Sequence, residues 1–187
     1  MPPKVKVTKE DIIKTALDIV RSRGVDAINA RSIASELGCS TQPIFSNFSG
    51  MEELEEAVVA SAREVYFSFL QREVESGKYP EYKAFGMGYI RFAKEEKELF
   101  KLLFMCDRQG KGLEAGTDFE KSVEYIMMAN GISKDEAERM HLEMWVCVHG
   151  IATMVATSFL EFSTEVISNM LTDVYQGLRS SHAREEK

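Results

Sequence analysis

The residues from 29 to 54 constrain the fold of this chain more than any others. They read NARSIASELGCSTQPIFSNFSGMEEL and form two short helical patterns separated by Gly38. The first covers about residues 30–37, and the second begins after Ser40, which we expect to be its N-cap. Two short helices joined by so tight a turn are typical of a helix-turn-helix, whose second helix lies in the major groove of DNA.

The second helix of this unit separates an inner apolar face from an outer polar one. Ile44 and Phe48 lie four residues apart and share the inner face, where Ile33 and Leu37 can complete a small core. The outward and flanking positions are uncharged: Thr41, Gln42, Phe45, Ser46 and Asn47. Glutamine side chains can bond N6 and N7 of adenine, and serine or threonine can bond base edges or phosphates. We therefore expect this face to contact DNA, the alternative being a merely solvated polar surface.

The net charge of −7 is distributed unevenly along the chain. Residues 1–50 carry seven Lys/Arg and five Asp/Glu, whereas residues 51–187 carry sixteen and twenty-five. Only the first segment is therefore suited to phosphate contact, and its excess of +2 is small. Two copies acting together would bind DNA far better than one.

Several other classes of protein are disfavoured by the composition. The first ten residues have no apolar core of the secretory kind, and Cys39, Cys106 and Cys147 are too widely spaced for a disulfide framework or a zinc site. The apolar run of residues 144–160 is short for a membrane span and contains His149 and Gly150. We expect a cytoplasmic protein that has no membrane span and needs no metal or cofactor.

Helical periodicity continues to the end of the chain, and no strand pattern is visible. Predicted helices cover about residues 9–23, 51–76, 81–95, 97–105, 117–129, 134–160 and 164–180. Capping boxes at Ser49–Glu52 and Ser133–Glu136 support two of the helix starts. The predicted fold is all-α, with a three-helix helix-turn-helix domain at 1–50 and a helical effector-binding and dimerisation domain at 51–187.

The last two predicted helices are more apolar than one small domain can cover. The final one alone carries Val166, Ile167, Met170, Leu171, Val174, Tyr175 and Leu178. A symmetric homodimer in which each subunit contributes these two helices to a four-helix bundle would bury the surplus. The alternative is that both faces are filled within one subunit.

Aromatic and methionine side chains recur at helical spacing in the second domain. We predict an apolar or aromatic effector pocket there, with His149 or Tyr89 as its polar group. The candidate effector-binding residues are Tyr89, Phe92, Phe104, Met105, Trp145 and His149. Ordinary core packing is the alternative for each of them.

The sequence offers little support for an enzyme. Cys147 and His149 lie two residues apart and so point away from each other on a helix. Cys106 with His149, or His141 with Glu143, remain open as pairs, but no residue is evident to orient them. No glycine-rich phosphate loop, metal cluster or nucleophile elbow is present, and we predict no catalytic function.

The order of these motifs resembles the TetR family of transcriptional regulators. The resemblance is carried by Ser22-Arg23-Gly24, by residues 27–34 and 37–40, by Phe45-Ser46-Asn47-Phe48 and by Met51-Glu52-Glu53-Leu54. Residues 89–93, Glu98-Leu99-Phe100 and Trp145 with His149-Gly150 are similar to one branch of TetR-like C-terminal domains. The resemblance implies a ligand-responsive repressor that binds a near-palindromic operator as a dimer. The DNA-contact positions that it implies are Arg31, Ser40, Thr41, Gln42, Phe45, Ser46 and Asn47.

Three residues depart from the family pattern. The family usually has Tyr at Phe45, His at Asn47 and Lys at Met51, and those residues typically hold phosphates. Fewer charge-assisted contacts should weaken DNA binding and make it less salt-dependent. The departures also keep a rival open, a helical protein-interaction module with a degenerate helix-turn-helix.

Overall fold

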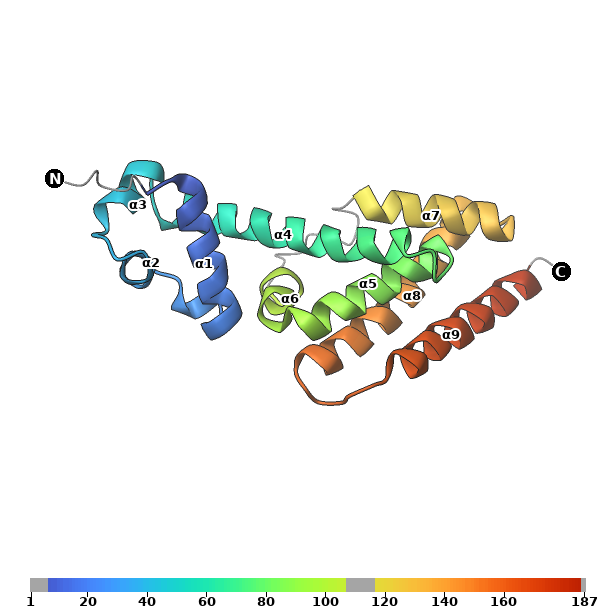
Figure 1. Cartoon of the computed structure of the whole chain (residues 1–187). Helices are drawn as coiled ribbons and strands as arrows, with labels where there is room; N and C mark the ends of the chain where they lie inside the picture. Colours follow the sequence, from blue (N-terminus) through green and yellow to red (C-terminus); the bar gives the residue numbers. More distant parts are fainter. Residues whose placement is uncertain (1–6, 107–116, 186–187) are drawn as a thin grey trace. The chain divides into compact units, whose positions relative to one another are not determined.

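The computed structural model describes residues 7–106 and 117–185, and within these ranges it contains nine α-helices, one 3-10 helix and no strand (Figure 1). The helices gather into two compact units. The first contains residues 7–67 and 96–106, and the second contains residues 68–95 and 117–185. The all-α fold is thus confirmed. The predicted functional division after residue 50 stays a prediction, since compactness does not test it.

The first unit comprises six elements. They are α1 (Lys9–Arg23), η1 (Val25–Ala27), α2 (Ala30–Glu36), α3 (Gln42–Asn47), the first part of α4 (Met51–Glu75) and α6 (Lys97–Phe104). Thr8 begins α1 through a capping box with Asp11, and Gly24 ends it with a φ of +80°. Both ends lie where the sequence predicts them.

The turn between α2 and α3 is built from backbone hydrogen bonds. Gly38 has a φ of +64°, its N–H donates to Ser35, and the N–H of Cys39 donates to Ala34. This pattern is a Schellman motif, which requires the left-handed conformation that glycine adopts without strain. The turn therefore sets the direction in which α3 leaves α2.

Helix α3 begins one residue later than the sequence predicts. Its first backbone acceptor is the carbonyl of Thr41, so Ser40 lies outside the helix. No side chain caps this end, and Pro43 in the first turn removes one N–H that would need a partner. The predicted N-cap role of Ser40 is therefore wrong.

The core of the first unit joins segments that are far apart in the sequence. Helix α1 packs against α2, α3 and α6. The buried apolar side chains include Ile12, Val20, Ile33, Ile44, Phe48, Leu54, Leu99 and Phe100. Both carboxylate oxygens of Glu96 accept hydrogen bonds from the guanidinium of Arg21, at 2.9 and 3.0 Å. This bidentate pair fastens the start of α6 to the last turns of α1.

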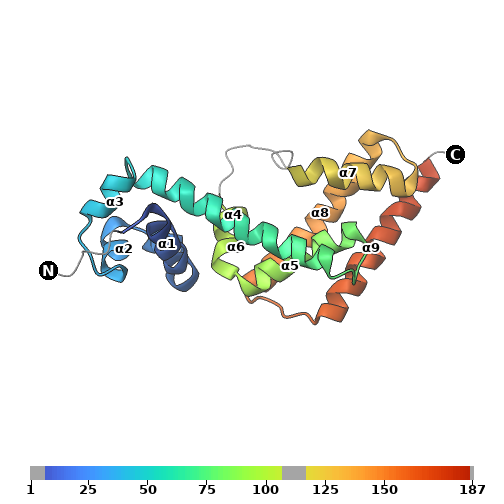
Figure 2. The ribbon, with the colours of Figure 1, turned by 45° about the horizontal axis from the view of Figure 1, so that its top comes forward.

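The second unit contains the rest of α4 with α5 (Glu81–Glu95), α7 (Thr117–Asn130), α8 (Lys134–Ala156) and α9 (Thr164–Glu185). Helix α8 packs against α5, α7 and α9, and the two views show these helices together (Figure 2). A Cβ placed on Gly88 of α5 would lie only 3.0 Å from the Cα of Leu70, so the glycine permits a close approach of α4 and α5.

Helix α8 ends earlier than predicted, at Ala156 rather than near residue 160. Ser158 takes a φ of +56°, its N–H donates to Val155, and the N–H of Phe159 donates to Met154. A serine thus occupies the position that glycine usually fills in a Schellman ending, which is why the sequence pattern does not reveal it. Among the described residues, no helix is long and apolar enough to cross a membrane.

A polar and aromatic cluster links α5, α7, α8 and α9 within the second unit. The hydroxyl of Tyr82 lies 2.9 Å from Nδ1 of His141, and the amide nitrogen of Asn130 donates to the hydroxyl of Tyr175 at 2.9 Å. Phe119 packs edge-on to His141 with ring centres 5.1 Å apart. Burial lowers the pKa of His141 to about 4 and raises the pKa of Tyr82. His141 is therefore neutral near pH 7.

This shift makes stability depend on pH in a defined direction. The folded-state pKa of His141 lies below its unfolded value of 6.5, so the unfolded chain takes up the proton first as the pH falls. The stabilisation is complete above pH 6.5 and is lost as the pH falls toward 4. Lowering the pH from 7 to 5 should reduce the unfolding free energy of wild type by about 1 kcal/mol more than that of His141→Gln. This value allows for the screening that comes with partial exposure of the ring.

Urea unfolding at both pH values, at one fixed protein concentration, measures this difference. The His141→Gln variant keeps an uncharged partner for Tyr82 but cannot gain a proton. His149→Gln serves as the comparison, because His149 is less buried and should contribute less. Equal pH dependence in wild type and His141→Gln would contradict the prediction.

Candidate functional site

The outward face of α3 is the first candidate site. Gln42, Phe45 and Ser46 are exposed, whereas Ile44 and Phe48 are almost completely buried. Phe45 exposes 54% of its surface. Of the other predicted DNA-contact residues, Arg31 and Ser40 are exposed and Thr41 and Asn47 are half-buried. The structure thus gathers these seven residues on α2, α3 and the turn between them.

Hydrogen bonds within α3 limit what two of these residues can offer. The hydroxyl of Ser46 donates to the carbonyl of Gln42 at 2.9 Å, so its oxygen remains available as an acceptor. The amide nitrogen of Asn47 donates to the carbonyl of Pro43 at 2.7 Å. The amide of Gln42, at the start of the helix, is the most adaptable polar group on this face.

Several cations of the first unit are already paired with carboxylates. The ammonium of Lys9 lies 2.9 Å from Glu53 and also over the ring of Phe48, and Arg23 lies 2.6 Å from Glu36. Arg31, on the first turn of α2, has no ion-pair partner among the side chains that the structure describes. Arg31 is therefore the best placed cation for a phosphate.

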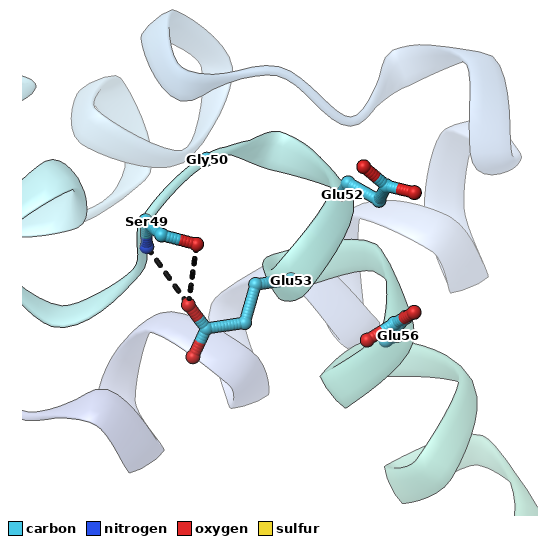
Figure 3. A pocket seen from close by; sticks show the side chains of 5 residues that line it. All are labelled: Ser49, Gly50, Glu52, Glu53 and Glu56. Atoms are coloured by element: carbon cyan, nitrogen blue, oxygen red, sulfur yellow. Dashed lines mark hydrogen bonds between the residues drawn. The ribbon is translucent and has the colours of Figure 1, made fainter.

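An acidic depression lies where α4 begins, and three residues separate this point from the end of α3. Ser49, Gly50, Glu52, Glu53 and Glu56 line it (Figure 3). Glu53, not Glu52 as predicted, accepts from the backbone N–H and the hydroxyl of Ser49, at 2.8 and 2.9 Å. The reason is that α4 begins at Met51, so Glu53 is its third residue and reaches back. The Ser49 N–H, Lys9 and the Ser49 hydroxyl together lower the pKa of Glu53 to about 2.

The sequence analysis does not predict this acidic depression. Four glutamates do occur in the run Met51-Glu52-Glu53-Leu54-Glu55-Glu56. The same pattern is equally typical of a solvated first helical turn, where the helix dipole favours carboxylates. Carboxylates repel phosphate, so with the uncharged Met51 they would weaken any electrostatic attraction between DNA and this end of the first unit.

The second candidate site lies between α5 and α8 in the second unit. The rings of Trp145 and His149 stack, with centres 4.7 Å apart and planes 7° from parallel. Nδ1 of His149 lies 2.9 Å from the hydroxyl of Tyr89, which is almost fully buried. Burial lowers the pKa of His149, so its imidazole is neutral near pH 7. Three of the predicted effector residues are thereby brought together around one polar contact.

The other three predicted effector residues lie elsewhere. Phe92 is fully buried and packs edge-on against Phe69, with ring centres 5.5 Å apart. Phe104 belongs to the first unit and packs against the ring of Tyr66. Met105, also in the first unit, is exposed after the end of α6. Their roles as effector contacts stay predictions, and among the described residues no group of His, Cys, Asp and Glu could hold a metal ion.

Comparison with known proteins agrees with this architecture. Residues 82–174 match the family model of the tetracyclin repressor-like C-terminal domain. A protein of unknown function from Rhodococcus sp. RHA1 has 21% identity, and the alignment covers 96% of this chain and 99% of that one, with a TM-score of 0.74. A TetR-like transcriptional regulator from Rhodococcus sp. RHA1 has 14% identity over 93% and 97%, with a TM-score of 0.67.

At these identities the two structures show a shared fold, and no curated protein matches the chain. The family match covers most of the second unit, including Tyr89, Trp145 and His149, together with α6 of the first. The helix-turn-helix of α2 and α3 supplies the other half of the architecture. Residues 82–174 therefore belong to the TetR-like C-terminal domains, and the chain as a whole has the fold of TetR-like transcriptional regulators.

Proposed function

We propose that this regulator binds a near-palindromic operator as a homodimer and represses transcription until an effector binds its second domain. The observation that carries the proposal is the outward face of α3, where Gln42, Phe45 and Ser46 are exposed over a fully apolar inner face. Because the inner face supplies the core contacts, packing within the subunit does not account for the outer residues. In a helix-turn-helix, that face enters the major groove.

The exposed residues suit separate parts of DNA recognition. Arg31 would hold a phosphate, and the amide of Gln42 would read an adenine through N6 and N7. Ser40, Thr41 and the acceptor oxygen of Ser46 would add bonds to phosphates or base edges. Asn47 would contribute least, because one of its amide hydrogens already serves the Pro43 carbonyl.

The dimer would form through α8 and α9, of which α8 keeps an exposed apolar stripe. On α8 this stripe includes Leu142, Val146 and Met154, and Val166 continues it at the start of α9. Gly150 lies between Val146 and Met154, and a Cβ there would meet nothing within 4 Å. Apolar side chains around a glycine allow a partner helix to approach closely.

The effector would bind near Tyr89, Trp145 and His149. A stacked Trp–His pair presents an aromatic surface, and the His–Tyr contact supplies the polar group that an apolar or aromatic effector needs for orientation. We propose no catalytic role and no cofactor. The free thiols of Cys39, Cys106 and Cys147 suit the reducing cytoplasm, where such a regulator would act.

Selection of purified protein against random double-stranded DNA tests the proposal. We expect enrichment of a palindrome whose half-sites each contain an adenine read by Gln42. Gln42→Ala should relax the preference at that adenine and lose about 1–3 kcal/mol for the preferred site. Gln71→Ala, on an exposed part of α4, is the matched control and should leave the motif unchanged.

Two outcomes would count against this function. An absence of enrichment at low salt would favour the protein-interaction module, for which the acidic depression and the paired cations already give some reason. An identical motif and affinity for wild type and Gln42→Ala would show that α3 does not read the bases.

A further inference from the structure

Phe45 is the one large apolar side chain on the exposed face of α3. Its ring is 54% exposed, while Ile44 and Phe48 on the same helix are 1% and 2% exposed and supply the core contacts. Packing inside the first unit therefore does not explain the exposed part of the ring. Its neighbours on the outer face, Gln42 and Ser46, are polar.

The chemistry of a phenylalanine ring limits what it can contact in DNA. The ring has no donor, acceptor or charge, so it cannot hold a phosphate by a hydrogen bond. In the major groove, the base edges present donors and acceptors with one apolar exception, the C5-methyl group of thymine. The hydroxyl hydrogen of Ser46 is turned back to the Gln42 carbonyl, so Ser46 offers no donor beside the ring.

We propose that Phe45 is a specificity-determining residue that packs against the C5-methyl group of a thymine in each half-site of the operator. The inference rests on the proposed function, because it requires α3 to lie in the major groove. Gln42 precedes Phe45 by three residues, nearly one helical turn, so the two side chains face neighbouring base pairs. Each half-site is thus read by one amide–adenine contact and one apolar contact.

Deoxyuridine provides the sharpest probe, since it differs from thymidine only by this methyl group. The duplexes carry the palindrome recovered by wild type from the random library, with each symmetric pair of thymines replaced in turn by deoxyuridine. For wild type, replacing one particular symmetric pair of thymines should weaken binding. Each lost methyl group should cost about four-fold in affinity, and the two together about fifteen-fold, as expected from the burial of one carbon in each half-site. The remaining replacements should have little effect.

Variants at Phe45 show whether the ring is the partner of the methyl group. Phe45→Ala should bind the thymine and deoxyuridine duplexes equally and should lose the thymine preference at that position in a new selection. Phe45→Leu, which stays apolar, should keep part of the preference. Phe67→Ala removes an exposed phenylalanine from α4 instead and should behave as wild type.

The outcomes separate this inference from the function on which it rests. A palindrome with no deoxyuridine effect at any position would overturn the role of Phe45 and leave the function standing. A deoxyuridine effect that persists unchanged in Phe45→Ala would also overturn it, because another residue would then contact the methyl group. Failure of wild type to enrich any motif would overturn both.

Discussion

Replacing Val146 by glutamate should make the protein monomeric and abolish operator binding at concentrations where wild type is saturated. Val146 lies midway along α8 and exposes 59% of its surface, so the folded subunit itself tolerates the charge. In the proposed twofold interface, each subunit would bury an unpaired carboxylate, at about 3–5 kcal/mol each. A monomer would also lose the second reading head, worth about 10²–10⁴-fold in affinity.

Sedimentation velocity and binding to the selected palindrome measure the two effects separately. The matched control is Met128→Glu, which places the same charge on α7, where Met128 is 87% exposed outside the proposed interface. This control should remain dimeric and should bind DNA as wild type does. A dimeric Val146→Glu protein with unchanged DNA binding would contradict the proposed interface.

Features that depend on a few neighbouring residues were predicted well from the sequence. The capping box between Ser133 and Glu136 and the end of the first helix at Arg23, before Gly24, both lie where the sequence predicts them. Such signals work because both partners lie within one helical turn, so no knowledge of the rest of the fold is needed. The inner face of α3 was predictable for the same reason.

Features that depend on distant residues were not predictable in this way. The pair of Arg21 and Glu96 joins residues 75 positions apart, and nothing in either local pattern indicates that α6 packs against α1. Local signals also failed where two readings compete. Glu52 and Glu53 are adjacent, and only the start of α4 at Met51 decides which one reaches Ser49.

The effector residues show the same limit. Trp145 and His149 share a helix face by their spacing of four, and their stacking follows from that. The contact of Tyr89 with His149 needs the packing of α5 on α8, which the sequence does not encode locally. Phe92 lies three residues after Tyr89, but its ring packs against Phe69 of α4. Periodicity identifies residues that face inward without separating a core position from a binding position.

Phe92→Ala should therefore destabilise the protein by about 3–5 kcal/mol, a large share of the stability of an ordinary domain. Phe92 is completely buried, and its edge-on contact with Phe69 adds about 0.5–1.5 kcal/mol beyond the area that is buried. Removing the ring leaves a cavity that the packed helices α4 and α5 cannot close, because they already approach so closely that a Cβ on Gly88 would lie 3.0 Å from the Cα of Leu70.

Denaturant unfolding of Phe92→Ala, Phe92→Leu and Phe67→Ala, at one protein concentration, measures this loss. Phe92→Leu fills most of the space and should lose less, and Phe67→Ala, at a 44% exposed ring, should lose under about 1 kcal/mol. If Phe92→Ala also lost under about 1 kcal/mol of unfolding free energy, the ring would have to border open space. Phe92 would then be an effector contact, as first predicted, and the site at Tyr89, Trp145 and His149 would extend toward α4.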